Sequence, residues 1–140
     1  MSTNSTISIE NEDGSIKQVY CHWDGDVNGV GKMLKLHYTT VEKVNELITL
    51  GDISSLEKNI GTKHSFDNRP DNETTFFGRD RGEDGTRPVR FNNMDHFLHD
   101  GDVQQYNYMF RNGDWYLVVN NGRFVDYAIQ LNILVDTASS

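Results

Sequence analysis

The sequence predicts an α+β fold, a single domain in which an antiparallel sheet of hairpins packs against a few helices. Three observations predict this class. Segments with apolar residues at every second position are typical of strands, and they occur in pairs joined by turn residues. Segments with apolar residues three and four positions apart are typical of amphipathic helices, and they lie between those pairs. The chain has 140 residues, which is the length of one ordinary domain.

Two pairs of alternating segments predict β-hairpins. In the first pair, strands at 7–9 and 16–23 flank a polar turn. In the second pair, strands at 106–110 and 115–119 flank Asn112-Gly113. An Asn-Gly pair between two alternating runs is the strongest short hairpin signal, so the second hairpin is expected with a two-residue turn.

The helix predicted most clearly lies between Thr39 and Gly51. Thr39 is followed three residues later by Glu42, which is the pattern of a capping box. Apolar residues over 41–48 then form one stripe, and Gly51 stands where a helix commonly ends in the left-handed conformation.

Four other segments also have helical spacing. We predict helices at 30–37 and 94–100, and one further helical turn at 52–56. Over 124–135 the apolar residues fit both a helix and a strand, and the helix is preferred.

Two stretches are expected to lack regular structure. Residues 1–5 are polar and predicted to be a disordered N-terminus, so that the domain occupies 6–140. Residues 59–88 are polar, charged and contain glycine, interrupted only by a short strand at 74–77. A long irregular segment inside a small domain is more often functional than idle.

Composition limits the partners that the chain can have. Thirteen Lys and Arg against 21 Asp and Glu give a formal net charge of -8, which repels nucleic-acid backbones and acidic membranes. Non-specific nucleic-acid binding is therefore not expected, and no window is apolar over the roughly 18 residues of a membrane span. Cys21 is the only cysteine and no signal-peptide pattern is present, so a cytoplasmic protein is expected.

The stretch 21–32, CHWDGDVNGVGK, combines glycines with a histidine and two aspartates. From Asp24 it begins like an EF-hand calcium loop, but Lys35 stands where the bidentate glutamate is required, and no metal is expected. A Walker phosphate loop is rejected because Met33 replaces the required Ser or Thr. Amides at a helix start attract anions, so an anion site remains open, with His22 as an additional donor.

A second candidate is the segment 78–90, which carries four arginines within an acidic protein. Guanidinium groups suit phosphate and carboxylate, which would make this segment a binding loop. Alternatively, it is a solvated loop whose interleaved acids neutralise the arginines. Both interpretations remain open from the sequence.

Weaker candidates involve histidines and aromatic rings. His96 and His99 stand three apart on a predicted helix, but no third metal ligand is placed, so ordinary surface residues are favoured. Tyr106, Tyr108 and Phe110 share one face of a predicted strand and could stack a planar base. No catalytic motif is identified.

Several segments together resemble a group of small uncharacterised proteins that tailed bacteriophages and prophages encode. The segments that carry the resemblance are YCHWDG at 20–25, GVG at 29–31, GDISSL at 51–56, GRDRGED at 78–84 and Trp115-Tyr116. The similarity spans residues 16–119. The group often has Trp-Asp-Gly-Tyr-Pro in its loop, whereas this chain has Asp26-Val27 in place of Tyr-Pro.

The resemblance implies a phage accessory protein, and such proteins are often devoted to disabling host immunity. We therefore expect a non-enzymatic protein that inhibits a bacterial defence by binding in the host cell cytoplasm. Its partner would be a host defence protein, as for an anti-CRISPR, or a small nucleotide signal. The alternative is a small nucleotide or phosphoester hydrolase that uses His22, Asp24 and the arginine segment. The sequence leaves open whether the chain forms a homo-oligomer.

The expected ligand-binding residues come from the glycine stretch and the arginine segment. They are His22, Trp23, Asp24, Gly25, Gly29, Gly31, Arg79, Arg81, Arg87 and Arg90. No catalytic residue, metal ligand or cofactor is assigned.

Overall fold

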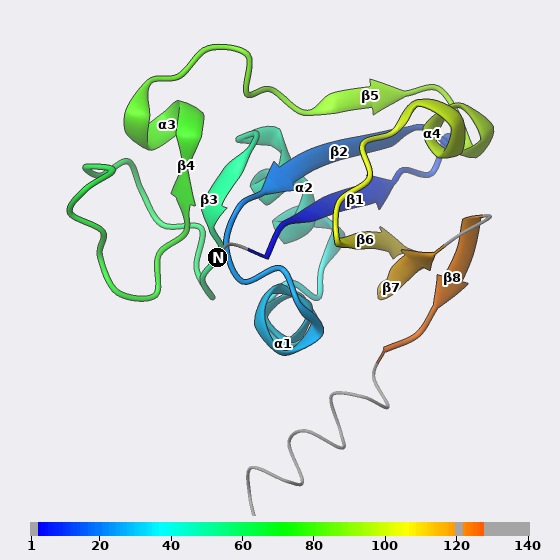
Figure 1. Ribbon diagram of the computed structural model, residues 1–140, viewed down its shortest axis with the longest axis horizontal. Coiled ribbons are helices and arrows are strands. Elements are labelled where there is room, and N and C mark those ends of the chain that lie inside the picture. The colour runs from blue at the N-terminus through cyan, green and yellow to red at the C-terminus, as the bar shows by residue number, and fades with distance from the viewer. Residues whose placement is uncertain (1–2, 120–121, 128–140) are drawn as a thin grey trace, which may run out of the picture.

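The computed structural model describes residues 3–119 and 122–127 of the chain. Within these residues, one mostly antiparallel eight-stranded sheet and four α-helices form an α+β arrangement, as predicted (Figure 1). The strands are β1 Ser5–Glu10, β2 Ile16–Cys21, β3 Ile53–Ser55, β4 Thr75–Phe76, β5 Val89–Phe91, β6 Tyr106–Arg111, β7 Asp114–Val119 and β8 Arg123–Val125. The helices are a π-helical turn η1 Val27–Gly31, α1 Lys32–His37, α2 Val41–Thr49, α3 Phe77–Arg81 and α4 Met94–Asp100.

The strands follow the order β4-β3-β2-β1-β6-β7-β8 across the sheet, and β5 also pairs with β2. β1 lies at the centre, antiparallel to β2 and parallel to β6, with Ile7 opposite both Val19 and Tyr108. β3 pairs with β2 at Cys21 in parallel, while β5 occupies the rest of the same edge of β2. Segments far apart in the sequence therefore meet around β1 and β2. None of the described helices has the length and apolar content that crossing a membrane requires.

Both predicted hairpins are confirmed, as β1–β2 and β6–β7. Asn112 and Gly113 both have positive φ, 52° and 81°, as a two-residue hairpin turn with right-handed strand twist requires. The short strand expected at 74–77 is present as β4. The helices predicted at 30–37 and 94–100 are also present, as η1 with α1 and as α4.

The helical turn predicted at 52–56 is wrong, because this segment contains β3. Its backbone pairs with β2 on one side and β4 on the other, and these pairings override a weak helical pattern. The helix predicted at 124–135 is wrong where the structure describes it, since β8 pairs with β7 there. Residues 128–135 lie outside the described residues.

Two boundaries differ by one residue from expectation, the cap of α2 and the start of the domain. The cap of α2 is Thr40 and not Thr39, because the Thr40 side chain accepts a hydrogen bond from the amide of Lys43. β1 begins at Ser5, which is fully buried, one residue before the expected start of the domain.

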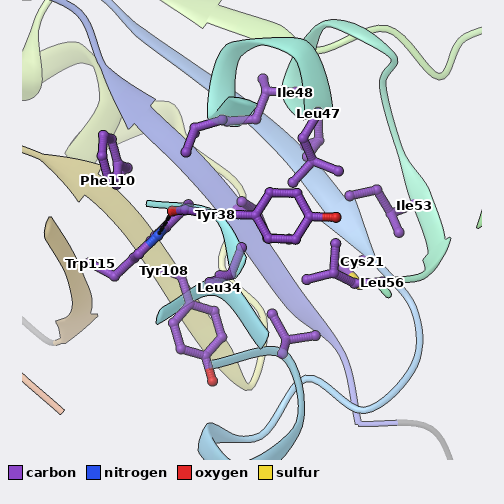
Figure 2. Close-up of a cluster of buried hydrophobic side chains, with 14 of the residues drawn as sticks. Cys21, Leu34, Tyr38, Leu47, Ile48, Ile53, Leu56, Tyr108, Phe110 and Trp115 are labelled. Atoms are coloured by element: carbon purple, nitrogen blue, oxygen red, sulfur yellow. Dashed lines mark hydrogen bonds between the residues drawn. The ribbon is translucent and has the colours of Figure 1, made fainter. Parts of the chain in front are cut away.

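Two hydrophobic clusters lie on opposite faces of the sheet. Ile7 and Ile9 of β1 belong to the larger cluster, which packs against α1 and α2. Met109, which pairs with Ser8 of β1, lies on the other face and belongs to the smaller cluster, together with residues of α4 and β5. In Figure 1, α2 lies behind β1 and β2, and α4 lies in front. Within the larger cluster, Trp115 links β7 to the end of α1, because its Nε1 donates to the carbonyl of Tyr38 at 2.8 Å (Figure 2).

Candidate functional site

The glycine stretch forms a tight turn whose amides are already hydrogen-bonded. After β2 the chain turns into η1, and the amide of Gly25 donates to the carbonyl of Thr3 at 2.9 Å. The Gly29 and Gly31 amides both donate to the carbonyl of Asp26, at 3.0 and 3.2 Å. The backbone groups that were expected to attract an anion therefore have partners within the turn.

Close approach of the backbone explains the glycines of this turn. A Cβ atom on Gly29 would strike the carbonyl oxygen of Asp24, and one on Gly25 would lie 2.9 Å from the carbonyl of Thr3. A Cβ atom on Gly31 would lie 3.0 Å from the hydroxyl of Tyr108. These three glycines are needed for packing, and no ligand is required to account for them.

His22 and Trp23 directly follow the end of β2, and His22 is half-buried whereas Trp23 is exposed. The Nδ1 atom of His22 lies 2.7 Å from the hydroxyl of Tyr20, and the His22 carbonyl accepts from the side-chain amide of Asn4 at 2.8 Å. The Trp23 ring meets the imidazole edge to face, with centroids 4.7 Å apart, and Trp23 is 42% exposed. Local contacts therefore fix the orientation of His22.

A cleft of about 300 Å³ opens beside the first turns of η1 and α1, and we call it the α1 cleft. Its lining residues are Asp24, Asn28, Gly29, Val30, Lys32, Met33, Leu36, His37, Leu56 and Glu57. Asp24 holds a left-handed φ of 56°, and Leu36 is 59% exposed. Of the expected ligand-binding residues, the α1 cleft thus contains Asp24 and Gly29.

The side chain of Arg79 forms several hydrogen bonds within the fold. Its Nε donates to Asp80 at 3.0 Å, and its Nη atoms donate to the carbonyls of Ile60, Gly61 and Thr74 at 3.0, 3.2 and 2.8 Å. The side chain also lies over the ring of Phe76. The guanidinium therefore fastens the segment 60–74 to α3.

Asp80 is the buried partner in this network. Its carboxylate accepts from the amides of Phe76 and His64 at 2.8 and 3.0 Å, besides Arg79. Burial alone would raise the pKa of Asp80, but the hydrogen bonds from Arg79 and the two amides outweigh it, and the pKa lies below its ordinary value.

The other three arginines are exposed. Arg81 pairs with Glu83 at 3.4 Å, and Arg90 donates to Asn92 at 2.8 Å. Arg87 is exposed on the loop before β5. In Figure 1, α3 lies at the upper left and α1 at the lower centre, and no residue of 78–90 lines the α1 cleft. The structure does not bring the glycine stretch and the arginine segment into one site.

Two weaker candidates are also placed by the structure. His96 and His99 both contact the carboxylate of Asp100, at 3.3 and 2.7 Å, and no described group of three or more His, Cys, Asp or Glu could hold a metal ion. Tyr108 and Phe110 are buried in the larger cluster, so their strand face offers no stacking platform.

A second and larger hollow lies beside α4 and was missed by sequence reasoning. This groove of about 690 Å³, the α4 groove, is lined by Phe97, Leu98, Gly101, Asp102, Val103, Gln104, Gln105, Asn107, Val118, Val119 and Gly122. Val103 is 77% exposed on it. Its lining comes from α4, the segment 101–105 and the ends of β6 and β7, which only the tertiary fold brings together.

Comparisons of the chain with protein-family models, with curated proteins and with solved structures found no match.

Proposed function

We propose that the protein is a bacteriophage accessory protein that inhibits a bacterial defence by binding a defence protein at the α1 cleft. The observation that carries the proposal is the exposure of Leu36, a large apolar side chain held 59% exposed at the rim of a cleft. An apolar side chain beside a hollow is typical of binding surfaces. The resemblance of residues 16–119 to tailed-phage proteins supports the biological setting.

The chemistry of the α1 cleft suits a protein partner. Met33 and Leu56 contribute apolar surface next to Leu36, while Asp24 and Glu57 contribute carboxylates. Protein interfaces usually combine apolar surface with polar and charged groups, and the α1 cleft contains both. The backbone at Asp24 has a left-handed φ of 56°, and its carbonyl accepts from the amide of Val30 at 2.7 Å, so this part of the α1 cleft is ordered before a partner binds.

Two observations favour a protein over a nucleotide signal. The amides of Gly25, Gly29 and Gly31 already donate to carbonyl groups, so they offer little to a phosphate. Arg79 has four hydrogen-bond acceptors within the fold, so its guanidinium is not free to hold a phosphate. Hydrolysis is disfavoured because His22 is bonded to Tyr20 and is not among the described residues that line the α1 cleft.

The proposal is tested in bacterial strains that each carry one defence system. The chain is expressed in each strain, and plaque formation by a phage that the system restricts is counted. We expect the wild-type chain to restore plaques in at least one strain and its Leu36→Glu variant to fail there. Val89→Glu is the matched control, because Val89 is 55% exposed on β5, outside the α1 cleft.

Purified components then identify the mode of inhibition. The wild-type chain should form a complex with one protein of the inhibited system, without bound nucleotide. Equal restoration by wild type and Leu36→Glu contradicts the proposal. Recovery of an unchanged nucleotide from the chain, or multiple-turnover hydrolysis of one, contradicts it in favour of sequestration or catalysis.

A further inference from the structure

We propose that the α4 groove is a second binding site, which takes a lysine- or arginine-bearing segment of a protein. This inference is independent of the proposed function, because the α1 cleft and the α4 groove share no residue. In Figure 1, α1 lies at the lower centre and α4 at the upper right.

The segment 101–105 is held rigidly at Asp102. The side-chain amide of the buried Gln18 donates to the Asp102 carbonyl and accepts from the Asp102 amide, both at 2.9 Å. Gln18 belongs to β2, in the interior of the sheet. The backbone on one side of Val103 is therefore fixed to the core.

The other side of Val103 is held in the same manner. Asn107 Oδ1 accepts from the amide of Gln104 at 2.9 Å, and Asn107 Nδ2 donates to the Gln104 carbonyl at 3.0 Å. Thr6 of β1 donates to the same Oδ1 atom at 2.9 Å, which orients the Asn107 amide.

Val103 lies between these two pairs of hydrogen bonds, and it is 77% exposed to solvent. An exposed valine on a loose loop would need no explanation, but here four hydrogen bonds to two side-chain amides fix the loop. Because the loop is already ordered, a partner that covers Val103 loses little loop entropy on binding. Leu98, 42% exposed, and Val118 extend the apolar surface of the α4 groove.

The polar side of the α4 groove selects for positive charge. Asp102 contributes a carboxylate, which Gln104 Nε2 orients by donating to it at 2.9 and 3.2 Å. No Lys, Arg or His occurs among the described residues that line the α4 groove. The groove also borders the C-terminal end of α4, the negative end of the helix dipole.

A lysine or arginine side chain matches both the apolar surface and the negative charge of the α4 groove. Its aliphatic stem covers apolar surface while its charged head stays near a carboxylate, here with Val103 and Leu98 beside Asp102. The formal net charge of -8 adds long-range attraction for a basic partner. Attraction by the net charge would act on a basic peptide anywhere on the surface. The test must therefore separate this long-range attraction from local binding in the α4 groove.

The experiment measures fluorescence anisotropy of a labelled twelve-residue peptide of alternating Lys and Ala with the full chain. A matched peptide of alternating Glu and Ala is the negative probe. We expect the Lys peptide to bind, Asp102→Asn to weaken binding about tenfold, and Val103→Ser to weaken it by a similar factor. Asp95→Asn, an exposed acid on α4 outside the groove, is the matched charge control and should change affinity less than about twofold.

Thermal melting of each variant tests whether the fold is retained. We expect Asp102→Asn to keep it, because the hydrogen bonds from Gln18 involve the Asp102 backbone and not its carboxylate. The inference is overturned if Asp95→Asn and Asp102→Asn weaken binding equally, if the Glu peptide binds as well, or if no peptide binds. Leu36→Glu should leave peptide binding unchanged, which separates this inference from the proposed function.

Discussion

Arg79 and Asp80, neighbours in the sequence, form a largely buried ion pair in which Nε and Oδ1 are 3.0 Å apart. The pair joins α3 to the long segment 60–74, because Arg79 also donates to three carbonyls of that segment. The segment is irregular in conformation but has a fixed attachment. An arginine that the sequence suggested for ligand binding is thus used to order a loop.

Replacing Arg79 should therefore destabilise the fold. Arg79→Ala leaves the buried carboxylate of Asp80 without its cation and three carbonyls without a donor, which we expect to lower the free energy of unfolding by about 3 kcal/mol. Urea denaturation at pH 7 measures this change. Arg87→Ala, at an exposed position, should cost less than about 0.5 kcal/mol, and equal losses for the two variants would make the network energetically unimportant.

Asp80 also predicts a dependence of stability on pH. Its folded pKa lies below the ordinary value of 3.8, so the ionised carboxylate stabilises the fold above that value. This contribution is lost as the pH falls through the lower folded pKa. The difference in unfolding free energy between wild type and Asp80→Asn should stay constant from about pH 7 to 5 and shrink below about pH 4. A difference of the same size at pH 7 and pH 3 would contradict this.

Gly29 tests the packing of the turn beside the α1 cleft. A side chain there would strike the Asp24 carbonyl, so Gly29→Ala should lower the free energy of unfolding by about 1 to 3 kcal/mol. Asn28→Ala, at the exposed neighbouring position, is the control and should stay within about 0.5 kcal/mol. Thermal or urea denaturation compares the two, and an unchanged stability of Gly29→Ala would show that the turn can relax.

Cys21 should be unreactive in the folded chain. Its side chain lies in the larger cluster (Figure 2), and burial raises the pKa of its thiol to about 12. An aromatic disulfide reagent at pH 8 should therefore react at least about a thousandfold more slowly in buffer than in 6 M guanidinium chloride. Similar rates in both solvents would mean that this part of the core opens readily.

Local patterns predicted the elements that depend on local chemistry. Asn112-Gly113 needs only its own two left-handed residues to specify a hairpin, and α4 needs only a cap and an apolar stripe. β3 could not be recognised in the same way. Ile53–Ser55 becomes a strand because β2 and β4 pair with it, and the parallel pairing of β1 with β6 likewise joins distant segments.

The candidate sites were less predictable than the fold. Asp24 and Gly29, two of the expected ligand-binding residues, line the α1 cleft, but the apolar residue Leu36 was not recognised, because its exposure depends on how α1 packs. No local sequence pattern indicates the α4 groove. Gln18 and Asp102 are 84 residues apart, and nothing in either segment alone indicates that they meet.

The most direct test of the central claim is the dissociation constant of the purified chain with the defence protein that it inhibits. Isothermal titration calorimetry should give a saturable complex for wild type and Val89→Glu, and an affinity at least about a hundredfold lower for Leu36→Glu. Equal affinity of all three proteins would contradict binding through the α1 cleft.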